Sequence, residues 1–266
     1  MKFKKLPVYY RYFKEYLRYK DITSIRDAAR YELTRRGSKR NRLIDCRIGK
    51  MHTRKGTNDF QFANYYYEWN VKSFILQHHE PYFYFFDIGA GIAEYSMIMG
   101  KKGKKTFVFE PIKSSYQTIS MNLTTNKLNN INAYNFGLGN ENIQTTMIVN
   151  PVNTGASRFI KPGEPIPANY KLEKAEIRKL DDIMPDMHID YQQPVLVKID
   201  VEGMEAEVLK GAQDFLTNCQ HVMLIVEDTH CGFENIEQVL KKIGGFEFGR
   251  VDHLNLYAIK REQPNN

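Results

Sequence analysis

Residues 82–96, which read YFYFFDIGAGIAEYS, constrain the fold of this chain more than any other stretch. Five consecutive aromatic residues lead into Asp87, and Gly89 and Gly91 follow it. The aromatic run is too short and too rich in β-forming residues for a buried helix, so it indicates a buried parallel strand. A strand that ends in an acid and a glycine-rich turn predicts the first strand and the ligand loop of a Rossmann-like domain.

The loop itself discriminates between ligands. A dinucleotide-binding loop, G-x-G-x-x-G, needs a third glycine for close packing of helix on strand, and Glu94 stands at that position. The Asp87 carboxylate can instead bind an ammonium group and stay close to a sulfonium. A cationic amino-acid ligand therefore fits better than a pyrophosphate. From the loop alone, a structural role in which Asp87 only caps the next helix stays open.

The second strand favours a ligand that contains a nucleoside. Residues 105–111 read KTFVFEP, and Glu110 follows Gly91 by 19 residues. An acid at the carboxyl end of this strand can accept both hydroxyls of a ribose, in nicotinamide-binding proteins as well as in others. Together with Asp87 it indicates S-adenosylmethionine, which carries a ribose, an ammonium group and a sulfonium.

The chain resembles the FkbM family of S-adenosylmethionine-dependent methyltransferases between Tyr82 and Asp228. The motifs that carry the resemblance are DIGAGIAEYS from Asp87, FEP ending at Pro111, LDD at 180–182 and VKIDVEGMEAEVLKGA at 197–212. The last motif is far more specific than the glycine loop. The family commonly has Asn at the position of Gly91 and Gly at that of Ala93. Alanine is small enough to pack there, so these departures bear on fine positioning of the cofactor rather than on its binding.

The resemblance implies an α/β fold, namely a Rossmann-like class I methyltransferase with a mostly parallel seven-stranded sheet. It also implies S-adenosylmethionine as cofactor, S-adenosylhomocysteine as product, and a hydroxyl acceptor on a sugar, a glycolipid or a similar metabolite. By the same resemblance, Phe136, Gly137 and Leu138 would lie near the adenine. The cofactor-binding residues that we expect are Asp87, Gly89, Ala90, Gly91, Ser96, Glu110, Pro111, Phe136, Gly137, Leu138 and Asp200.

Two other functions stay open. One is methyl transfer to nitrogen or to a protein. The other is a non-catalytic adaptor that binds an adenosine ligand at a membrane surface, because a fold alone does not establish activity. The set of Asp87, Glu110 and Asp200 argues against the adaptor.

Carboxylates also gather at the ends of the two later strands. PVLVKID ends at Asp200 and HVMLIVED ends at Asp228, and in the strand order 3-2-1-4-5 these strands are neighbours. Asp200, Glu227 and Asp228 should therefore emerge together, where they repel one another unless a cation or a proton intervenes. A Mg²⁺ site with these three ligands is one prediction. The alternative is a metal-free site in which Asp200 or His230 acts alone.

Methylation of a hydroxyl requires removal of its proton, because a neutral alcohol is a poor nucleophile. His230, two residues after Asp228, is the catalytic base that we expect. Asp200 and Glu202 would lie behind it as further catalytic residues.

Charge divides the chain into two parts. Residues 1–56 contain 18 lysines and arginines against 5 acids, a balance of +13, whereas the remainder has 20 against 26, or −6. We therefore expect a basic N-terminal helical appendage at 1–56. A methyltransferase domain would follow at 57–266, with an insertion at about 141–190.

Helical spacing describes the appendage further. A first helix would place Leu6, Tyr10, Phe13 and Leu17 on one apolar face. A second would begin at a capping box formed by Ser24 and Asp27, stop at Gly37, and be followed by a small strand between Arg47 and Lys55.

Three roles of the appendage stay open. In the first role, its aromatic face would pack on the catalytic domain or on a second copy in a homodimer. In the second role, its basic and aromatic residues would contact an anionic membrane surface. The third role, nucleic-acid binding, has no recognition motif to support it, so we expect no nucleic-acid partner.

Two stretches are candidates for the acceptor site. Residues 60–77 predict a helix whose Tyr65, Tyr66, Tyr67 and Trp69 wall the acceptor or, alternatively, pack in the core. Residues 153–170 predict a lid in which Asn153, Thr154, Ser157 and Arg158 offer hydrogen bonds, or else a surface loop.

Cysteine usage and hydropathy indicate the compartment. Cys46, Cys219 and Cys231 have no C-x-x-C spacing, which argues against disulfides and zinc and favours a reducing cytoplasm. The sequence shows no signal peptide and no apolar run of roughly 18 residues that could span a membrane. We expect a soluble cytoplasmic protein, with peripheral membrane contact through the appendage as an option.

Overall fold

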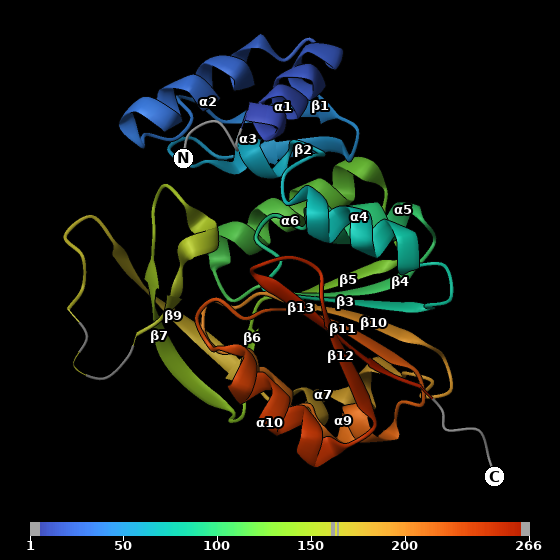
Figure 1. The fold of residues 1–266 in the computed structure, drawn as a ribbon. Coiled ribbons are helices and arrows are strands. Elements are labelled where there is room, and N and C mark those ends of the chain that lie inside the picture. Colours follow the sequence, from blue (N-terminus) through green and yellow to red (C-terminus); the bar gives the residue numbers. More distant parts are fainter. Residues whose placement is uncertain (1–5, 161–162, 164, 262–266) are drawn as a thin grey trace.

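A seven-stranded sheet forms the centre of the chain (Figure 1). The computed structural model describes residues 6–160, 163 and 165–261. In spatial order the strands are β12 (Phe246–Arg250), β13 (Asn255–Lys260), β11 (Val222–Glu227), β10 (Val195–Ile199), β3 (Tyr84–Ile88), β4 (Lys105–Phe109) and β5 (Ile131–Tyr134). The strands from β11 to β5 are parallel, and β13 runs antiparallel to both of its neighbours. The predicted order 3-2-1-4-5 is confirmed for β5, β4, β3, β10 and β11.

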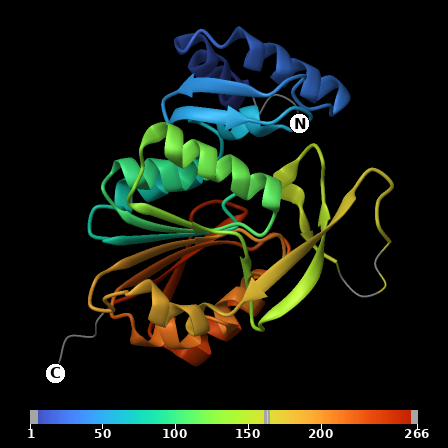
Figure 2. The same ribbon diagram turned by 180° about the vertical axis from the view of Figure 1, so that it is seen from behind.

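Helices cover both faces of this sheet (Figures 1 and 2). One face carries α4 (Trp69–His78), α5 (Glu94–Lys101) and α6 (Lys113–Asn126). The other carries α7 (Leu180–Met187), α8 (Glu205–Lys210), α9 (Gln213–Asn218) and α10 (Phe233–Ile243). This three-layer arrangement confirms the Rossmann-like class I methyltransferase fold.

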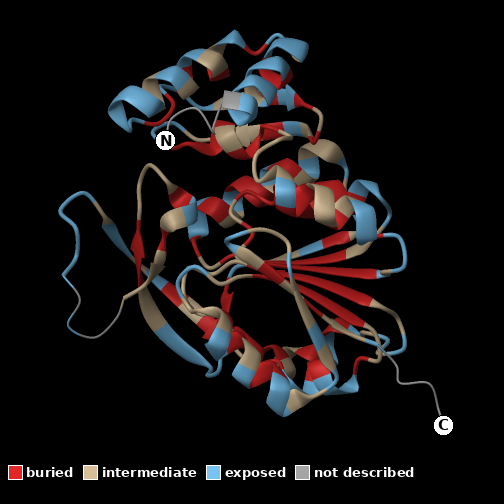
Figure 3. Cartoon of the chain, viewed as in Figure 1, coloured by how far each residue is buried: buried red, intermediate tan, exposed pale blue. Residues whose placement is uncertain are grey.

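Strand β3 shows why the sheet is buried on both sides. All five of its residues are buried, and successive side chains point to opposite faces. Phe85 packs with Val71 and Ile75 of α4, whereas the ring of Phe86 lies 5.1 Å from that of Phe215 on the opposite face. Figure 3 shows the central strands as buried along most of their length. A continuous apolar run in the sequence therefore reflects two separate cores.

A second, four-stranded sheet is formed mainly by the insertion. Its strands are β6 (Gly137–Leu138), β9 (Lys171–Arg178), β7 (Ile143–Val149) and β8 (Arg158–Phe159), and a 3-10 turn, η2 (Thr154–Ala156), lies between β7 and β8. The stretch 131–139 is divided between the two sheets, because Ile131–Tyr134 pairs with β4 and Gly137 pairs with Ile177 of β9. The interpretation of 153–170 as a surface loop is wrong for β8 and η2.

The N-terminal part contains α1 (Leu6–Arg18), α2 (Ile22–Thr34) and a hairpin of β1 (Arg42–Cys46) and β2 (Gly49–Thr53), which replaces the single strand expected at 47–55. Figure 2 shows the hairpin lying along α6. Here the His52 amide donates to Asn122 Oδ1 at 2.6 Å, and Asn126 Nδ2 donates to the Lys50 carbonyl at 2.7 Å. The hairpin is thus fastened to the helices of the sheet.

Two predicted helix boundaries in this region are wrong. Helix α2 begins at Ile22 rather than after Ser24, because the Asp21 carboxylate accepts the Ser24 amide at 3.0 Å and acts as the cap. The helix expected at 60–77 is divided into α3 (Asp59–Phe62) and α4. The break occurs because the Asn64 side chain accepts the Tyr66 amide at 3.1 Å and Glu68 adopts a left-handed conformation.

The apolar face expected for α1 is exposed. Tyr10, Phe13 and Leu17 are 61%, 47% and 43% exposed, whereas Tyr16 is buried and its hydroxyl donates to the Phe60 carbonyl at 3.1 Å. The helix therefore turns a different side toward the domain than its spacing suggests. Residues 1–5 of the predicted appendage and the Leu6 side chain lie outside the described residues.

In the part of the chain that the structure describes, no helix combines the length and the apolar character needed to cross a bilayer.

We expect Phe86→Ala to lower the free energy of unfolding by about 3–5 kcal/mol, because it leaves a cavity between β3 and α9. Phe83→Ala is the matched control, since Phe83 precedes the strand and is 49% exposed, and we expect it to cost less than about 1.5 kcal/mol. Urea denaturation of both variants measures the difference. Equal losses would contradict the two-core description of β3.

Candidate functional site

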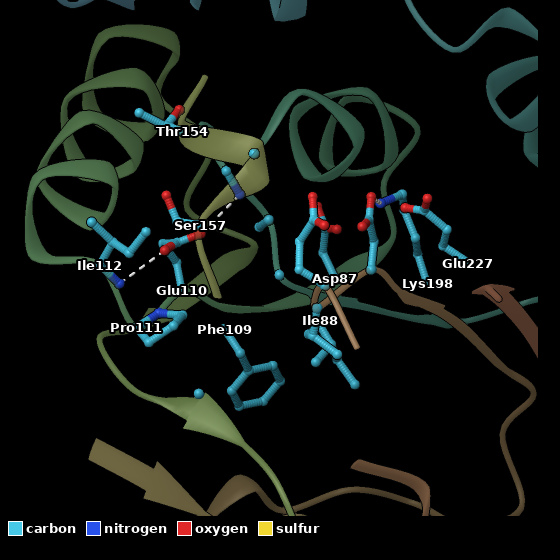
Figure 4. A pocket seen from close by; sticks show the side chains of 18 of the residues that line it. Asp87, Ile88, Phe109, Glu110, Pro111, Ile112, Thr154, Ser157, Lys198 and Glu227 are labelled. Carbon is cyan, nitrogen blue, oxygen red and sulfur yellow. Dashed lines mark hydrogen bonds and ion pairs between the residues drawn. The ribbon is translucent and has the colours of Figure 1, made fainter. Parts of the chain in front are cut away.

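A cavity of about 300 Å³ opens at the carboxyl ends of β3, β4, β10 and β11. This is the position where open parallel sheets bind ligands. Loops after these strands, the segment before α4 and the insertion all contribute to its wall. In the view of Figure 4, Asp87 lies between Glu110 on one side and Lys198 and Glu227 on the other.

Asp87 is held at the end of β3 with one oxygen unsatisfied. Its Oδ2 atom accepts the Ser96 amide at 3.1 Å and the Ser96 hydroxyl at 2.5 Å. Its Oδ1 atom is buried and has no hydrogen-bond partner among the described residues. Burial raises the pKa of Asp87, although the nearby Lys198 ammonium opposes this shift. A buried carboxylate oxygen that lines a cavity and lacks a donor is suited to an ammonium group.

The loop after β3 approaches its neighbours too closely for side chains. Gly89 has a φ of +83°, and a Cβ atom there would lie 1.9 Å from the Asp200 carbonyl oxygen. Glycine is therefore required at this position. Ala93 also adopts a left-handed conformation, with a φ of 67°, and α5 begins after it.

Glu110 is placed on the opposite side of the cavity by two backbone amides. Gly91 donates to its Oε2 atom at 2.9 Å, and Ile112 donates to its Oε1 atom at 2.8 Å. Burial raises the pKa of Glu110 to about 7. Each oxygen keeps a further lone pair, so the carboxylate can accept the two hydroxyls of a ribose.

Apolar groups continue the wall beyond Glu110. Pro111, Gly137, Leu138 and Phe159 line this end of the cavity. A Cβ atom on Gly137 would lie 3.4 Å from the Phe159 ring and 3.5 Å from Pro111, so glycine keeps the gap between them open. Such a slot suits the flat faces of a nucleobase.

Of the eleven residues expected to bind the cofactor, all but Ser96 and Phe136 line the cavity. Ser96 is buried behind Asp87, which it orients through the two hydrogen bonds above. Phe136 points into the core, where its ring lies 5.8 Å from that of Phe109, and the Arg178 guanidinium covers it at 4.6 Å. The orphan oxygen of Asp87, the Glu110 carboxylate and the apolar slot together fit S-adenosylmethionine.

Lys198 introduces a positive charge that the sequence reasoning missed. It is buried within β10, and its Nζ atom contacts Asp200 Oδ2 at 3.0 Å. Burial alone would raise the pKa of Asp200, but the Lys198 ammonium lowers it. Burial and the neighbouring Asp200 charge raise the pKa of Glu227 to about 8. The pair thus holds one proton at neutral pH, on Glu227, while Asp200 stays ionised beside a fixed cation. The sequence did contain a sign of this buried charge, namely a lysine inside the otherwise apolar strand PVLVKID.

A second set of residues that the sequence reasoning missed comes from α4 and α5. The Tyr95 hydroxyl donates to Glu68 Oε2 at 2.8 Å, and the Tyr95 ring lies 4.7 Å from Lys72 Nζ and 4.8 Å from Lys198 Nζ. Burial raises the pKa of Glu94 to about 7 and lowers that of Lys72, which lies 3.8 Å away. These groups make the cavity wall polar next to Asp87.

Glu202, rather than His230, reaches the cavity wall. His230 is half-exposed behind it, with Nε2 at 2.9 Å from Glu202 Oε2. Burial, followed by the charges of Asp200 and Glu205, raises the pKa of Glu202 to about 7. Glu202 adopts a left-handed φ of 54°, and Glu205 holds this turn by accepting the Gly203 amide at 2.9 Å. A strained residue at a cavity suggests a functional role.

The predicted set of three metal ligands is not brought together. Asp200 and Glu227 are adjacent, but Asp228 turns away and forms an ion pair with Arg250 at 2.6 Å. Among residues 6–160, 163 and 165–261, no group of three His, Cys, Asp or Glu side chains is arranged to hold a metal ion. Lys198 and the proton on Glu227 reduce the repulsion that motivated the Mg²⁺ prediction.

The predicted lid residues lie at the cavity, whereas most of the predicted aromatic wall does not. Asn153, Thr154 and Ser157 line the cavity, and the charge of Arg158 acts on Glu202. Of the four aromatic residues, Tyr67 alone lines it. Tyr65, Tyr66 and Trp69 pack on one another, with ring centroids 5.0–5.8 Å apart.

The N-terminal part fastens this lid. The Arg54 guanidinium holds Asp59 through two hydrogen bonds and donates to Thr154 Oγ1 at 3.1 Å and to Ser115 Oγ at 3.0 Å. The backbone amide of Asn58 donates to the Val152 carbonyl at 2.8 Å. Residues before β3 therefore help to close the cavity.

Comparison with known proteins gives a family match over most of the domain. A family model described as the methyltransferase FkbM domain matches residues 87–252. Methyltransferase 1 from Beauveria bassiana (strain ARSEF 2860) is 23% identical over 144 residues, which cover 48% of this chain and 57% of that protein. The chain thus spans little more than half the length of this curated relative.

Solved structures with a similar fold include three methyltransferases, each 9% identical to this chain. The magnesium protoporphyrin IX methyltransferase from Synechocystis, with bound S-adenosylmethionine, aligns with a TM-score of 0.41 over 71% of this chain and 76% of that chain. An S-adenosylmethionine-dependent methyltransferase from Agrobacterium tumefaciens aligns with a TM-score of 0.43 over 84% of this chain and 71% of that chain. An rRNA methylase from Streptococcus thermophilus aligns with a TM-score of 0.39 over 73% of this chain and 95% of that chain.

We expect Asp87→Asn to weaken the binding of S-adenosylmethionine about tenfold to a hundredfold, because a charge-assisted hydrogen bond contributes about 1.5–3 kcal/mol. Isothermal titration calorimetry measures the affinity. Asp186→Asn, on the exposed side of α7, is the matched control and should bind as the wild type does. Unchanged affinity in a folded Asp87→Asn variant would contradict the assigned role of Asp87.

Proposed function

We propose that this chain, which belongs to the FkbM family of S-adenosylmethionine-dependent methyltransferases, methylates a hydroxyl group of a sugar, a glycolipid or a similar metabolite. The observation that carries the proposal is the contact between Glu202, on the cavity wall, and His230 behind it. A carboxyl group with a pKa of about 7 changes its protonation state near neutral pH, as a general base must.

The binding residues divide between the two halves of the cofactor. Asp87 Oδ1 would accept the ammonium group, Glu110 would accept the ribose hydroxyls, and the slot at Gly137 would hold the adenine. When bound, S-adenosylmethionine supplies a methyl group on a positively charged sulfur. The carboxylates of Asp87 and Asp200 favour that positive charge in the cavity.

Glu202 would take the proton of the acceptor hydroxyl. A pKa of about 7 makes Glu202 a stronger base than an ordinary carboxylate, while part of the population is still deprotonated at neutral pH. His230, 51% exposed, can pass the proton on to solvent. Lys198 keeps Asp200 ionised, so Asp200 does not compete for that proton. Most of the rate enhancement would come from alignment of the hydroxyl with the methyl group.

The wall around Glu202 supports a hydroxylated acceptor. Glu68 and Ser157 line the cavity with oxygen-bearing side chains, and the Tyr67 and Phe62 rings pack in a T shape with their centroids 5.0 Å apart. Carboxylates and hydroxyls bind sugar-like hydroxyl groups, and aromatic rings cover their apolar faces.

An amine acceptor is the second candidate. The acids on the wall, including Glu68, Glu94, Glu202 and Glu227, outnumber Lys72 and Lys198, and such a surplus favours a cation. The two acceptors differ in their products. Incubation with methyl-labelled S-adenosylmethionine and fractionated metabolites, followed by mass spectrometry and NMR of the labelled product, distinguishes a methoxy group from an N-methyl group. An N-methyl product would contradict the first proposal.

We expect Glu202→Gln to lower kcat by about 10²- to 10⁴-fold, because it removes the base. The affinity for S-adenosylmethionine should change little. In the wild type, kcat should fall as the pH drops through about 7, since Glu202 becomes protonated, and this limb should disappear from the residual activity of the variant.

Asp228→Asn is the control, because Asp228 pairs with Arg250 and does not line the cavity. Its pH profile should match that of the wild type. If Glu202→Gln kept the wild-type rate and profile, another residue would have to be the base.

A further inference from the structure

A groove of about 490 Å³ runs between α1 and α2, within the range of roughly 300–1,000 Å³ that ligand pockets occupy. Val8 and Phe13 of α1 and Ile25 and Ala28 of α2 form its walls. Figure 1 shows the two helices side by side at the N-terminal end of the molecule. The lining is mostly apolar, so the groove suits a hydrocarbon better than a polar ligand.

The rim of this groove is exposed in the described chain. Val8, Tyr9 and Phe13 are 45%, 42% and 47% exposed. Removing such surface from water contributes about 25 cal/mol per Å², and contiguous exposed apolar patches mark binding sites. Tyrosine at the rim also suits a boundary between hydrocarbon and water. Covering the groove with an apolar ligand would therefore be favourable.

The groove and the cavity that contains the methyl-transfer residues have a wall residue in common. Tyr67 belongs to the lining of both, and Phe62, whose ring centroid lies 5.0 Å from that of Tyr67, lines the cavity. Tyr12, on the floor of the groove, is close to Glu68 of the cavity. Burial and then the Glu68 charge raise the pKa of the Tyr12 hydroxyl to about 12. One molecule could therefore contact both spaces.

We propose that the groove binds the hydrocarbon chain of an amphipathic acceptor whose hydroxylated headgroup lies in the cavity. The polar cavity and the apolar groove, which share Tyr67 in their walls, match the two halves of such a molecule. This inference deepens the proposed function and rests on it for the reaction at the headgroup. Binding of the chain in the groove can be tested separately.

The net charge of the N-terminal part favours an anionic amphiphile. Among the described residues, the lining contains one charged residue, Glu32, but Arg11, Lys14 and Arg18 are exposed elsewhere on α1, and residues 1–56 together carry a balance of +13. Such a field attracts anionic headgroups and assemblies and raises their rate of encounter with the protein. A second copy of the chain, which would carry the same excess of positive charge, is a less suitable occupant.

The test uses the full chain and dansylated undecanoate, an anionic amphiphile whose fluorescence rises in apolar surroundings. Ala29→Trp fills the groove, because Ala29 lines it from the exposed side of α2. Leu33→Trp is the matched control. Leu33 lies on the same helix, is 86% exposed and does not line the groove.

We expect the wild type and Leu33→Trp to bind the probe with affinities within about twofold of each other, and Ala29→Trp to bind it at least about tenfold more weakly. Affinity for S-adenosylmethionine, measured by calorimetry, should be equal in all three proteins. Equal probe affinity in Ala29→Trp, or no binding by the wild type, would overturn the proposal.

Two rival occupants give different results. A dimer in sedimentation that Ala29→Trp dissociates and Leu33→Trp does not would make the groove an interface between copies. Binding to anionic vesicles that is insensitive to Ala29→Trp, with no binding of the probe, would assign the basic surface to a membrane instead. Either result overturns the proposal. If the wild type bound the probe but transferred no methyl group to any hydroxylated acceptor, the proposed function would be contradicted and the groove would be a separate lipid site.

Discussion

The burial of the Asp87 carboxylate at the end of β3 is the constraint on which the site depends. Ser96 satisfies one oxygen, and the other faces the cavity without a donor among the described residues. An unpaired buried acceptor costs about 1–3 kcal/mol, and a ligand ammonium group would offset that cost. The turn at Gly89, which approaches the Asp200 backbone, brings β3 and β10 close enough for both acids to line one cavity. Lys198 then determines which of the neighbouring carboxyl groups is ionised.

The N-terminal part and the insertion belong to the same site. Arg54 connects Asp59, α6 and the turn at Thr154, so the lid is held by residues that precede the first strand of the large sheet. One positive charge of residues 1–56, that of Arg54, is therefore placed against the cavity wall at Thr154. If the α1–α2 groove holds a hydrocarbon chain, this part also contributes to acceptor recognition.

Local patterns predicted the strands and the positions of Asp87, Glu110 and Asp200, because each acid follows a short, mostly apolar run that indicates a buried strand. The strand order came from the Rossmann-like arrangement. What the sequence could not indicate depends on contacts between distant residues. Phe136 and Gly137 are adjacent, yet one side chain enters the core and the other residue borders the cavity, since the chain passes between two sheets there. Asp228 does not lie with the other two predicted metal ligands, because it pairs with Arg250, 22 residues later in the chain. The exposed side of α1 was misassigned because helical spacing identifies an apolar face but not the surface that it meets.

The central claim, that Asp87 and Glu110 hold the two halves of one sulfonium nucleoside, is tested most directly by a crystal structure with S-adenosylhomocysteine bound. We predict electron density for the ammonium group within hydrogen-bond distance of Asp87 Oδ1 and for both ribose hydroxyls at Glu110. Density for the nucleoside elsewhere, or a water molecule at Asp87 Oδ1 with the ligand bound, would contradict the account.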